Sequence, residues 1–205
     1  MLDTAAVVLA AGAATRMGRA KQLLDLAGAP LVRAAAVAAL DAGCRPVAVV
    51  LGAHAAQVAA ALRGLDVETV INPDWERGIG ASIASGVACV ERGDPRAALI
   101  TLADQPLVGS AALRRLIAAR HDAARPIAAS RYAGTVGVPA CFARALFPLL
   151  RALESAQGCK PLLRAHADDT VLVDCPEAEL DVDTPDDYAR LLSVATPDAS
   201  ERVAR

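Results

Sequence analysis

Aromatic residues are scarce in this sequence: two phenylalanines, two tyrosines and one tryptophan occur among 205 residues. Surfaces that bind single-stranded nucleic acid by base stacking need several exposed aromatic rings, so this composition argues against such a surface. The formal net charge of −2 also provides no attraction to nucleic acid or to an anionic membrane. We therefore expect neither nucleic acid nor a membrane among the partners.

Cysteine and histidine are too sparse and too dispersed to predict a disulfide framework or a metal cluster. The five cysteines include no C-x-x-C pair and the three histidines are far apart, a pattern that fits a reducing compartment. Long apolar runs are also missing. The run at residues 5–14 follows an acidic leader and is too short to span a bilayer, so we expect no signal peptide and a cytoplasmic location.

The length suits one α/β domain, and short apolar runs alternate with helical segments along the chain. This alternation predicts a three-layer α/β/α, doubly wound, mostly parallel sheet of the Rossmann-like type, with a single domain at 1–195 and a disordered tail at 196–205. We expect strands at 5–10, 46–51, 67–71, 97–102, 126–131, 170–174 and 180–182. We expect helices at 31–42, 53–62, 83–91, 113–121, 142–150 and 186–194, a turn at 25–30, a loop at 134–139, and at 157–164 a loop leading into a short helix.

The stretch at 5–21 is the most informative part of the chain. A buried strand is followed by small residues with Gly12 and Gly18, and a loop of this kind lets backbone N–H groups converge on an anion. Arg16 and Lys21 add positive charge, so we interpret the loop as a polyphosphate cradle. Its spacing fits neither the dinucleotide fingerprint G-x-G-x-x-G nor the P-loop. An ordinary strand–loop–helix connection with solvated cations is the alternative.

The order L-A-A-G-x-x-x-R-M-G-x-x-K, at 9–21, resembles the signature of the MobA-like nucleotidyltransferase family. The resemblance runs to about residue 192 and is nearest to molybdenum cofactor cytidylyltransferase. It implies catalytic roles for Arg16, Lys21 and Asp104. It also implies nucleotide contacts from Leu9, Ala10, Ala11, Gly12, Arg16, Lys21, Gly78 and Ser82.

A second family motif follows the third expected strand. The relatives carry W-x-x-G-x-x-x-S, which closes over the base, and Trp75, Gly78 and Ser82 match it. Glycines let backbone approach a ligand, and a serine hydroxyl can satisfy a polar base edge. The alternative is that Ser82 caps the next helix.

Two carboxylates complete the implied site. Asp104 ends the strand at 97–102, where an acid can hold Mg²⁺, and its alternative role is a turn residue. Asp183 matches the second metal carboxylate of the family and is otherwise a helix cap or pre-helix acid. Asp181 would face the opposite side of an extended segment and is the weaker candidate. Thr184 and the proline and acids after it predict a helix start.

Two further segments resemble family features less closely. The G-V-P triplet at 137–139 resembles the segment that faces the second substrate. The stretch at 157–160 lacks the aspartate of the G-D-x-G found in many relatives, which puts its role in doubt. Lys160 is either a contact for an anionic substrate or a solvated lysine.

The resemblance implies an Mg²⁺-dependent transfer of CMP from CTP to the phosphate of molybdopterin-type molybdenum cofactor, with release of pyrophosphate. The A-A-G triplet is the cytidylyl-like form. A molybdenum hydroxylase apo-enzyme would be a further partner. Three alternatives stay open: another nucleotide such as GTP, a sugar-phosphate acceptor, or a non-catalytic protein that binds and delivers the cofactor.

Overall fold

The computed structural model describes residues 3–153 and 156–195, and these contain one seven-stranded sheet with the order β5-β4-β1-β6-β8-β7-β9. Strand β8 runs antiparallel to both of its neighbours, and the remaining pairs are parallel. The expectation of a mostly parallel α/β sheet is therefore confirmed. The strands are β1 Thr4–Ala10, β4 Val47–Leu51, β5 Glu68–Ile71, β6 Ala97–Leu102, β7 Ile127–Tyr132, β8 Thr135–Ala143 and β9 Thr170–Asp174.

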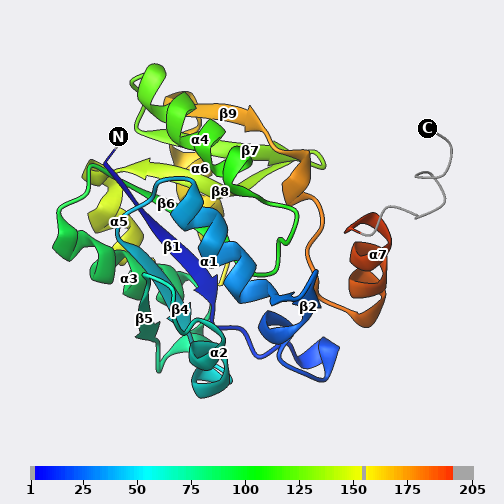
Figure 1. Cartoon of the computed structure of the whole chain (residues 1–205). Helices are drawn as coiled ribbons and strands as arrows, with labels where there is room; N and C mark the ends of the chain where they lie inside the picture. The colour runs from blue at the N-terminus through cyan, green and yellow to red at the C-terminus, as the bar shows by residue number, and fades with distance from the viewer. Residues whose placement is uncertain (1–2, 154–155, 196–205) are drawn as a thin grey trace, which may run out of the picture.

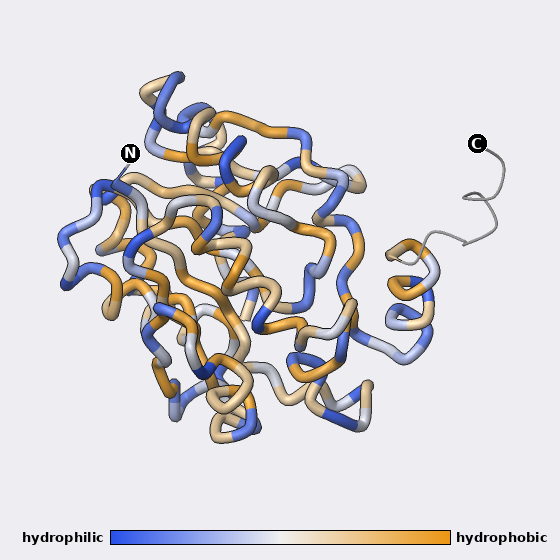
Figure 2. Tube along the Cα trace, in the orientation of Figure 1, coloured by the Kyte–Doolittle hydropathy of each residue, from blue (hydrophilic) through white to orange (hydrophobic). Residues whose placement is uncertain are grey.

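Helices cover both faces of this sheet and give the three layers visible in Figure 1. One face packs on α1 Leu31–Asp41, α2 Ala55–Ala61 and α4 Ser110–Asp122, and the other on α3 Ile79–Val90, α5 Phe147–Arg151 and α6 Lys160–Ala165. Along β1, Val7 and Val8 point to opposite cores because strand side chains alternate. Both are fully buried, and the orange strands through the middle of Figure 2 show how apolar the sheet is.

Helix α7, Pro185–Ala195, lies apart from these layers, beside the hairpin of β2 Asp25–Leu26 and β3 Ala29–Pro30 (Figure 1). The expected turn at 25–30 is this hairpin. The predicted helix start is also confirmed, because Asp187 N–H donates to Oγ1 of Thr184 and the Asp187 carboxylate accepts from Thr184 N–H at 2.8 Å. The expected tail at 196–205 lies outside the described residues.

The expected loop at 134–139 is wrong, because most of it belongs to β8. Glycine and proline there had indicated a loop, but Pro139 lies where the ladder between β7 and β8 changes register, between Ala129 and Ser130. A proline is tolerated at such an irregularity because a ladder hydrogen bond is already missing. Ser130 Oγ donates instead to the Pro139 carbonyl at 2.7 Å.

Three further boundaries differ from expectation. The expected helix at 142–150 is strand β8 as far as Ala143, then a 3₁₀ turn at Arg144–Leu146, and only then helix α5. An apolar run alone does not distinguish a buried strand from a buried helix. The expected strand at 180–182 pairs with no strand, although Val182 N–H donates to the Asp104 carbonyl at 2.9 Å. The expected helix at 83–91 begins earlier, at Ile79.

Among the described residues, no helix combines the length and the apolar composition needed to cross a membrane.

Candidate functional site

A cavity of about 190 Å³ opens at the carboxyl ends of β1 and β6. Ligands of open α/β sheets bind at this kind of edge. Seven of the residues predicted from the sequence line it: Leu9, Ala10, Ala11, Gly12, Lys21, Ser82 and Asp104. Its other lining residues are Gln22, Trp75, Ile79, Leu102 and Ala103. The structure thus brings most of the expected nucleotide contacts into one place.

The loop after β1 turns through left-handed backbone at Ala14, with φ 54°, and at Gly18, with φ 68°. Of the two glycines in the loop, Gly18 uses the left-handed conformation open to glycine, and Gly12 does not, because its φ is not positive. A Cβ added at Gly12 would meet nothing within 4 Å, so this side of the loop is open. Gly12 therefore leaves room beside the backbone, and the sharp turns lie further along the loop.

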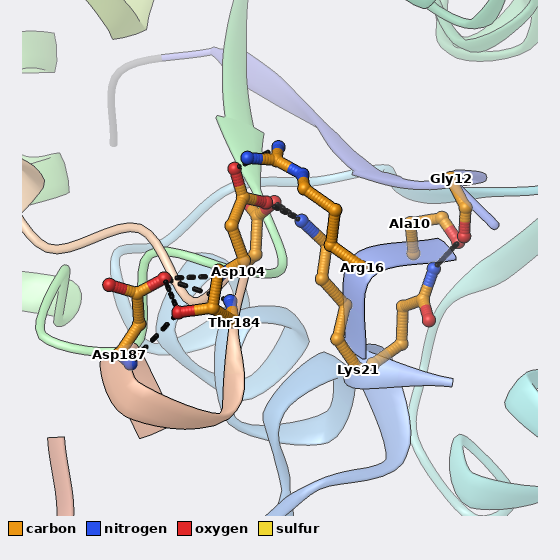
Figure 3. Close-up of polar contacts among 9 residues, drawn as sticks. Ala10, Gly12, Arg16, Lys21, Asp104, Thr184 and Asp187 are labelled. Carbon is orange, nitrogen blue, oxygen red and sulfur yellow. Dashed lines mark hydrogen bonds and ion pairs between the residues drawn. The ribbon is translucent and has the colours of Figure 1, made fainter. Parts of the chain in front are cut away.

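Gln22 holds this loop from within. Its side-chain Nε2 donates to the carbonyl of Ala10 at 3.0 Å and to the carbonyl of Gly12 at 2.6 Å, and the residue is only 2 % exposed. Two carbonyl acceptors fix the amide orientation, since only the NH₂ end can donate. Both carbonyls, which belong to residues labelled in Figure 3, are thereby occupied within the protein. In the described part of the chain the amides of Gly12, Ala13 and Ala14 donate to no backbone carbonyl, whereas that of Met17 donates to Ala14, so the first three are open to a ligand.

Two cations of the loop meet two carboxylates from distant parts of the chain. Lys21 Nζ donates to Asp104 Oδ2 and, at 2.7 Å, to Asp183 Oδ1, and Arg16 Nη2 donates to Asp183 Oδ2 at 2.7 Å. Figure 3 shows Lys21 reaching toward Asp104, with the Arg16 side chain beside it. Because these groups alternate in charge, each is partly neutralised by its neighbours. Arg16, Lys21, Asp104 and Asp183 thus form one charge cluster.

The electrostatics of this charge cluster follow from those contacts. Burial alone would lower the pKa of Lys21, but the carboxylates of Asp104 and Asp183 outweigh it and the pKa lies above its usual value. Hydrogen bonding to Lys21 lowers the pKa of Asp183, and the charge of Arg16 adds to that effect. The net effect on both groups favours their charged forms at neutral pH.

A small apolar cluster holds the two halves of the site together. Met17 is 7 % exposed and packs with Leu24 and Leu31 from the N-terminal part and with Val182 and Leu191 from the C-terminal part. Met17 directly follows Arg16, and Val182 directly precedes Asp183. Burying these side chains therefore places the cations of the loop beside the acid of the C-terminal segment.

Ser82 lies inside helix α3, whose N-cap residue is Gly78, so it is not the helix cap. Gly78 is not among the cavity-lining residues. Its φ is 119°, and a Cβ there would lie 2.8 Å from the Cα of Ala156. Trp75 lines the cavity and packs against Gly52, where an added Cβ would lie 2.5 Å from the indole Cγ. Gly78 is thus placed against the segment that follows residue 155, and Trp75 against the ligand space.

The acids of the site fit a divalent cation. Asp104 Oδ1 is buried and has no hydrogen-bond partner in the described part of the chain, and the carboxylate of Asp183 lies on the other side of Lys21 Nζ. Within residues 3–153 and 156–195, no group of three or more His, Cys, Asp or Glu side chains could hold a metal by itself. Mg²⁺ is commonly bound through one or two carboxylates together with substrate phosphates, so this donor set fits it.

A second cavity, of about 420 Å³, shares the side chains of Leu9, Ile79 and Leu102 with the first. Burial and the charge of Asp104 raise the pKa of Asp181 to about 6. Asp181 lines this second cavity and not the first. The expected reason, alternation along a strand, is wrong, because residues two positions apart share one face and the segment at 180–183 is not a strand. The other polar or glycine residues that line the second cavity are Tyr132, Gly137, Gln157, Gly158, Lys160 and Arg164.

Sequence reasoning missed Gln22, Met17 and Asn72. Gln22 follows Lys21 directly, but a single sequence cannot distinguish a buried glutamine from a solvated one. Met17 lies inside the motif, yet its apolar partners come from both ends of the chain. Asn72 lies three residues before the W-x-x-G-x-x-x-S motif, and no local pattern shows that it is only 2 % exposed.

Comparisons with known proteins agree with this geometry. The model of a family described as MobA-like NTP transferase domain matches residues 6–171. Nicotine blue oxidoreductase of Paenarthrobacter nicotinovorans is 34% identical over 197 residues, which is 91% of this chain and 95% of that protein.

Solved structures show the same fold. Rv0371c of Mycobacterium tuberculosis H37Rv has a TM-score of 0.80 at 33% identity, over 93% of this chain and 97% of that one. Another structure of that protein is a complex with manganese, with a TM-score of 0.74 at 34% identity and coverage of 93% and 98%. A nucleotidyl transferase from Methanothermobacter thermautotroptrophicus has a TM-score of 0.77 at 27% identity, over 94% and 97% of the two chains.

Proposed function

The chain belongs to the MobA-like NTP transferase domain family, and from this premise we propose that it transfers CMP from CTP to the phosphate group of a molybdopterin-type acceptor. Pyrophosphate is the second product. The observation that carries the proposal is the charge cluster beside the first cavity, where Arg16 and Lys21 face Asp104 and Asp183. Polyphosphate chemistry needs both signs of charge at one place.

The reaction forms a bond between an oxygen of the acceptor phosphate and the α-phosphorus of the nucleotide. The bond from the α-phosphorus to the bridging oxygen of the β-phosphate breaks, and pyrophosphate leaves with that electron pair. A phosphate monoester is already anionic at neutral pH, so the attack needs no general base. No histidine lines the first cavity in the part of the chain that the structure describes, and the mechanism requires none.

Alignment and charge neutralisation are left to the protein. The amides of the loop that Gln22 holds in place would bind the triphosphate, and Arg16 and Lys21 would stabilise the charge that grows on the leaving pyrophosphate. Lys21 is the better placed of the two, since its side chain is 13% exposed against 69% for Arg16. Removing one such donor costs on the order of 2.7–4 kcal/mol in the transition state.

Asp104 and Asp183 would hold Mg²⁺, with Asp104 Oδ1 as the free ligand atom. When bound, Mg²⁺ would neutralise phosphate oxygens and orient them for the attack. Lys21 contacts both carboxylates, so it would have to release at least one of them to take up its role on the phosphates.

The acceptor is assigned to the second cavity, because this cavity shares a wall with the first and contains the G-V-P segment. Lys160 and Arg164 give it positive charge, and Tyr132 and Asp181 give it hydrogen-bonding groups. Its volume of about 420 Å³ suits a bicyclic or tricyclic molecule better than a single phosphate. The A-A-G triplet is what favours CTP over GTP.

A panel of nucleotides and acceptors tests this function. Each of the four NTPs is incubated with Mg²⁺, with and without molybdopterin-type cofactor or a sugar 1-phosphate, and pyrophosphate is measured. We expect release with CTP and the pterin, and none from Asp104→Ala under the same conditions. Asp122→Ala is the matched control, since Asp122 is an exposed acid near the end of α4. Full turnover by Asp104→Ala would remove the assignment of the metal ligand.

A redox function is the second candidate, because the relative named nicotine blue oxidoreductase matches nearly the whole chain. Following the absorbance of nicotine blue with a reduced nicotinamide nucleotide as hydride donor tests it. A colour change without pyrophosphate release in the panel would favour this candidate. Tight binding of the pterin with neither outcome would instead favour a cofactor-delivery role.

A further inference from the structure

Asn72 and Ser82 form a buried pair at the Trp75 end of the first cavity. Asn72 follows β5 and is 2 % exposed, and Ser82 lies in the first turns of α3 and is 3 % exposed. The Ser82 residue lines the cavity and Asn72 does not. Asn72 Nδ2 and Ser82 Oγ are 3.1 Å apart.

The backbone decides which end of the Asn72 amide meets Ser82. The N–H of Asp74 donates to Asn72 Oδ1 at 3.0 Å. A backbone N–H can only donate, so the atom that it meets must be the carbonyl oxygen. The NH₂ end is then the end that faces Ser82, and Ser82 Oγ accepts from it.

The hydroxyl of Ser82 therefore keeps its own proton for another partner. A helical serine often uses that proton on the carbonyl four residues earlier, as Ser85 does on Ala81 at 3.0 Å. Ser82 makes no such bond within the described residues. Around it the cavity wall is apolar, with Trp75 and Ile79 as neighbours. Among the described residues this proton has no acceptor, and Ser82 itself lines the ligand space.

We propose that Asn72 is a positioning residue that fixes Ser82 as a hydrogen-bond donor to the nucleotide base. This inference rests on the proposed function. A hydroxyl held in this way pairs with a ring nitrogen or a carbonyl oxygen, such as N3 or O2 of cytosine, and it disfavours an amino group at the same point. Base selection then depends on a residue that touches no ligand.

Nucleotide binding without acceptor tests the proposal, with the Kd of each of the four NTPs measured by calorimetry in Mg²⁺ at pH 8. Ser82→Ala should raise the Kd of the preferred NTP by about threefold to tenfold, as expected for one lost hydrogen bond. Asn72→Asp replaces the amide donor by a carboxylate, which takes the Ser82 proton and turns Oγ into an acceptor. Asn72→Asp should raise the Kd of the preferred NTP at least as much as Ser82→Ala does. It should also reduce the differences in Kd among the four NTPs.

The double variant distinguishes an effect that acts through the hydrogen bond between Asn72 and Ser82 from a general effect on charge or folding. If Asn72 acts through Ser82, then Asn72→Asp in the Ser82→Ala background causes no further loss. An equal loss in both backgrounds overturns the proposal, because the effect is then one of charge or folding. Asn72→Ala, which adds no charge, should weaken NTP binding when made alone. Made in the Ser82→Ala background, it should cause no further change in Kd.

Two controls make each outcome decisive. Ser85→Ala, one turn further along α3, should leave every Kd unchanged because that hydroxyl is already satisfied. If Ser82→Ala also leaves every Kd unchanged while pyrophosphate is released normally, the inference fails and the proposed function stands. If no NTP binds the wild type and no pyrophosphate is released, both fail. Thermal unfolding of each variant checks that the fold is kept.

Discussion

The ammonium nitrogen of Lys21 lies 2.7 Å from Oδ1 of Asp183, across 162 positions of sequence. The same ammonium also contacts Asp104 Oδ2. One positive charge thus separates two carboxylates that would otherwise repel each other. On the proposed function a divalent cation would compete with Lys21 for the same two acids, which gives the first prediction.

Lys21→Met should make the protein less stable without metal and more responsive to Mg²⁺. We expect a loss of about 1–3 kcal/mol in the free energy of unfolding in EDTA, between the values for exposed and buried pairs. Saturating Mg²⁺ should raise the melting temperature of the variant more than that of the wild type. The matched control is Arg19→Met, since Arg19 is on the same loop and its guanidinium lies 5.6 Å from the Tyr188 ring centroid. Equal Mg²⁺ responses in Lys21→Met and wild type would contradict the competition.

Gln22→Leu should impair nucleotide use more than folding. The variant leaves the carbonyls of Ala10 and Gly12 without their donor, so the loop loses the arrangement that frees its amides. We expect kcat/KM for the nucleotide to fall by about tenfold, equivalent to about 1.4 kcal/mol. Gln22→Glu should behave alike, because a carboxylate cannot donate. Steady-state kinetics of both variants test this, with Gln57→Leu, at an exposed position, as the control. Values of kcat/KM equal to wild type in all three would contradict the role of Gln22 in holding the loop.

Gly86→Ala should destabilise the fold although alanine favours helices. An added Cβ would lie 2.3 Å from Val7 Cγ1 and 2.8 Å from Val50 Cγ2, so α3 would have to move off the sheet. Overpacking of this kind costs about 1–3 kcal/mol, measurable by urea denaturation. Gly109→Ala, where nothing lies within 4 Å of the new atom, should stay near wild type. A gain in stability for Gly86→Ala would show that the contact relaxes freely.

The cysteines should resist alkylation in the native protein. Burial raises the pKa of Cys44, Cys141 and Cys159 to about 12, so at pH 8 their thiolate fraction is about one in ten thousand. Burial also raises the pKa of Cys89 and Cys175. Iodoacetamide followed by mass spectrometry should show slow labelling that speeds up about tenfold per pH unit, and full labelling in urea. Rapid native labelling at pH 8 would contradict the burial.

The sequence was most informative where a motif coincided with a strong local signal. The apolar run at 5–10 and the small residues after it predict strand β1 and the loop, because both follow from local chemistry. Asp104 was found because an acid ends a buried strand. The position of Asp183 came from the family resemblance, and the structure shows it against Lys21.

The remainder depends on contacts that no local pattern encodes. The role of Gln22 needs two carbonyls ten and twelve positions earlier in the chain to turn toward it. Strand β8 was missed because Pro139 is a loop signal unless a neighbouring strand changes register there. The orientation of the Asn72 amide is set by one backbone N–H, that of Asp74, and it cannot be predicted from the sequence.

The apolar cluster of Met17 with Val182 and Leu191 has a consequence for biosynthesis. A chain emerging from the ribosome exposes Arg16 and Lys21 early and their partner Asp183 late. Until helix α7 has been translated, the loop at 11–20 has no counter-charge from the segment around Asp183 and no apolar anchor there. On the proposed function, a nascent chain is therefore expected to acquire nucleotide affinity only after Leu191 has left the ribosome.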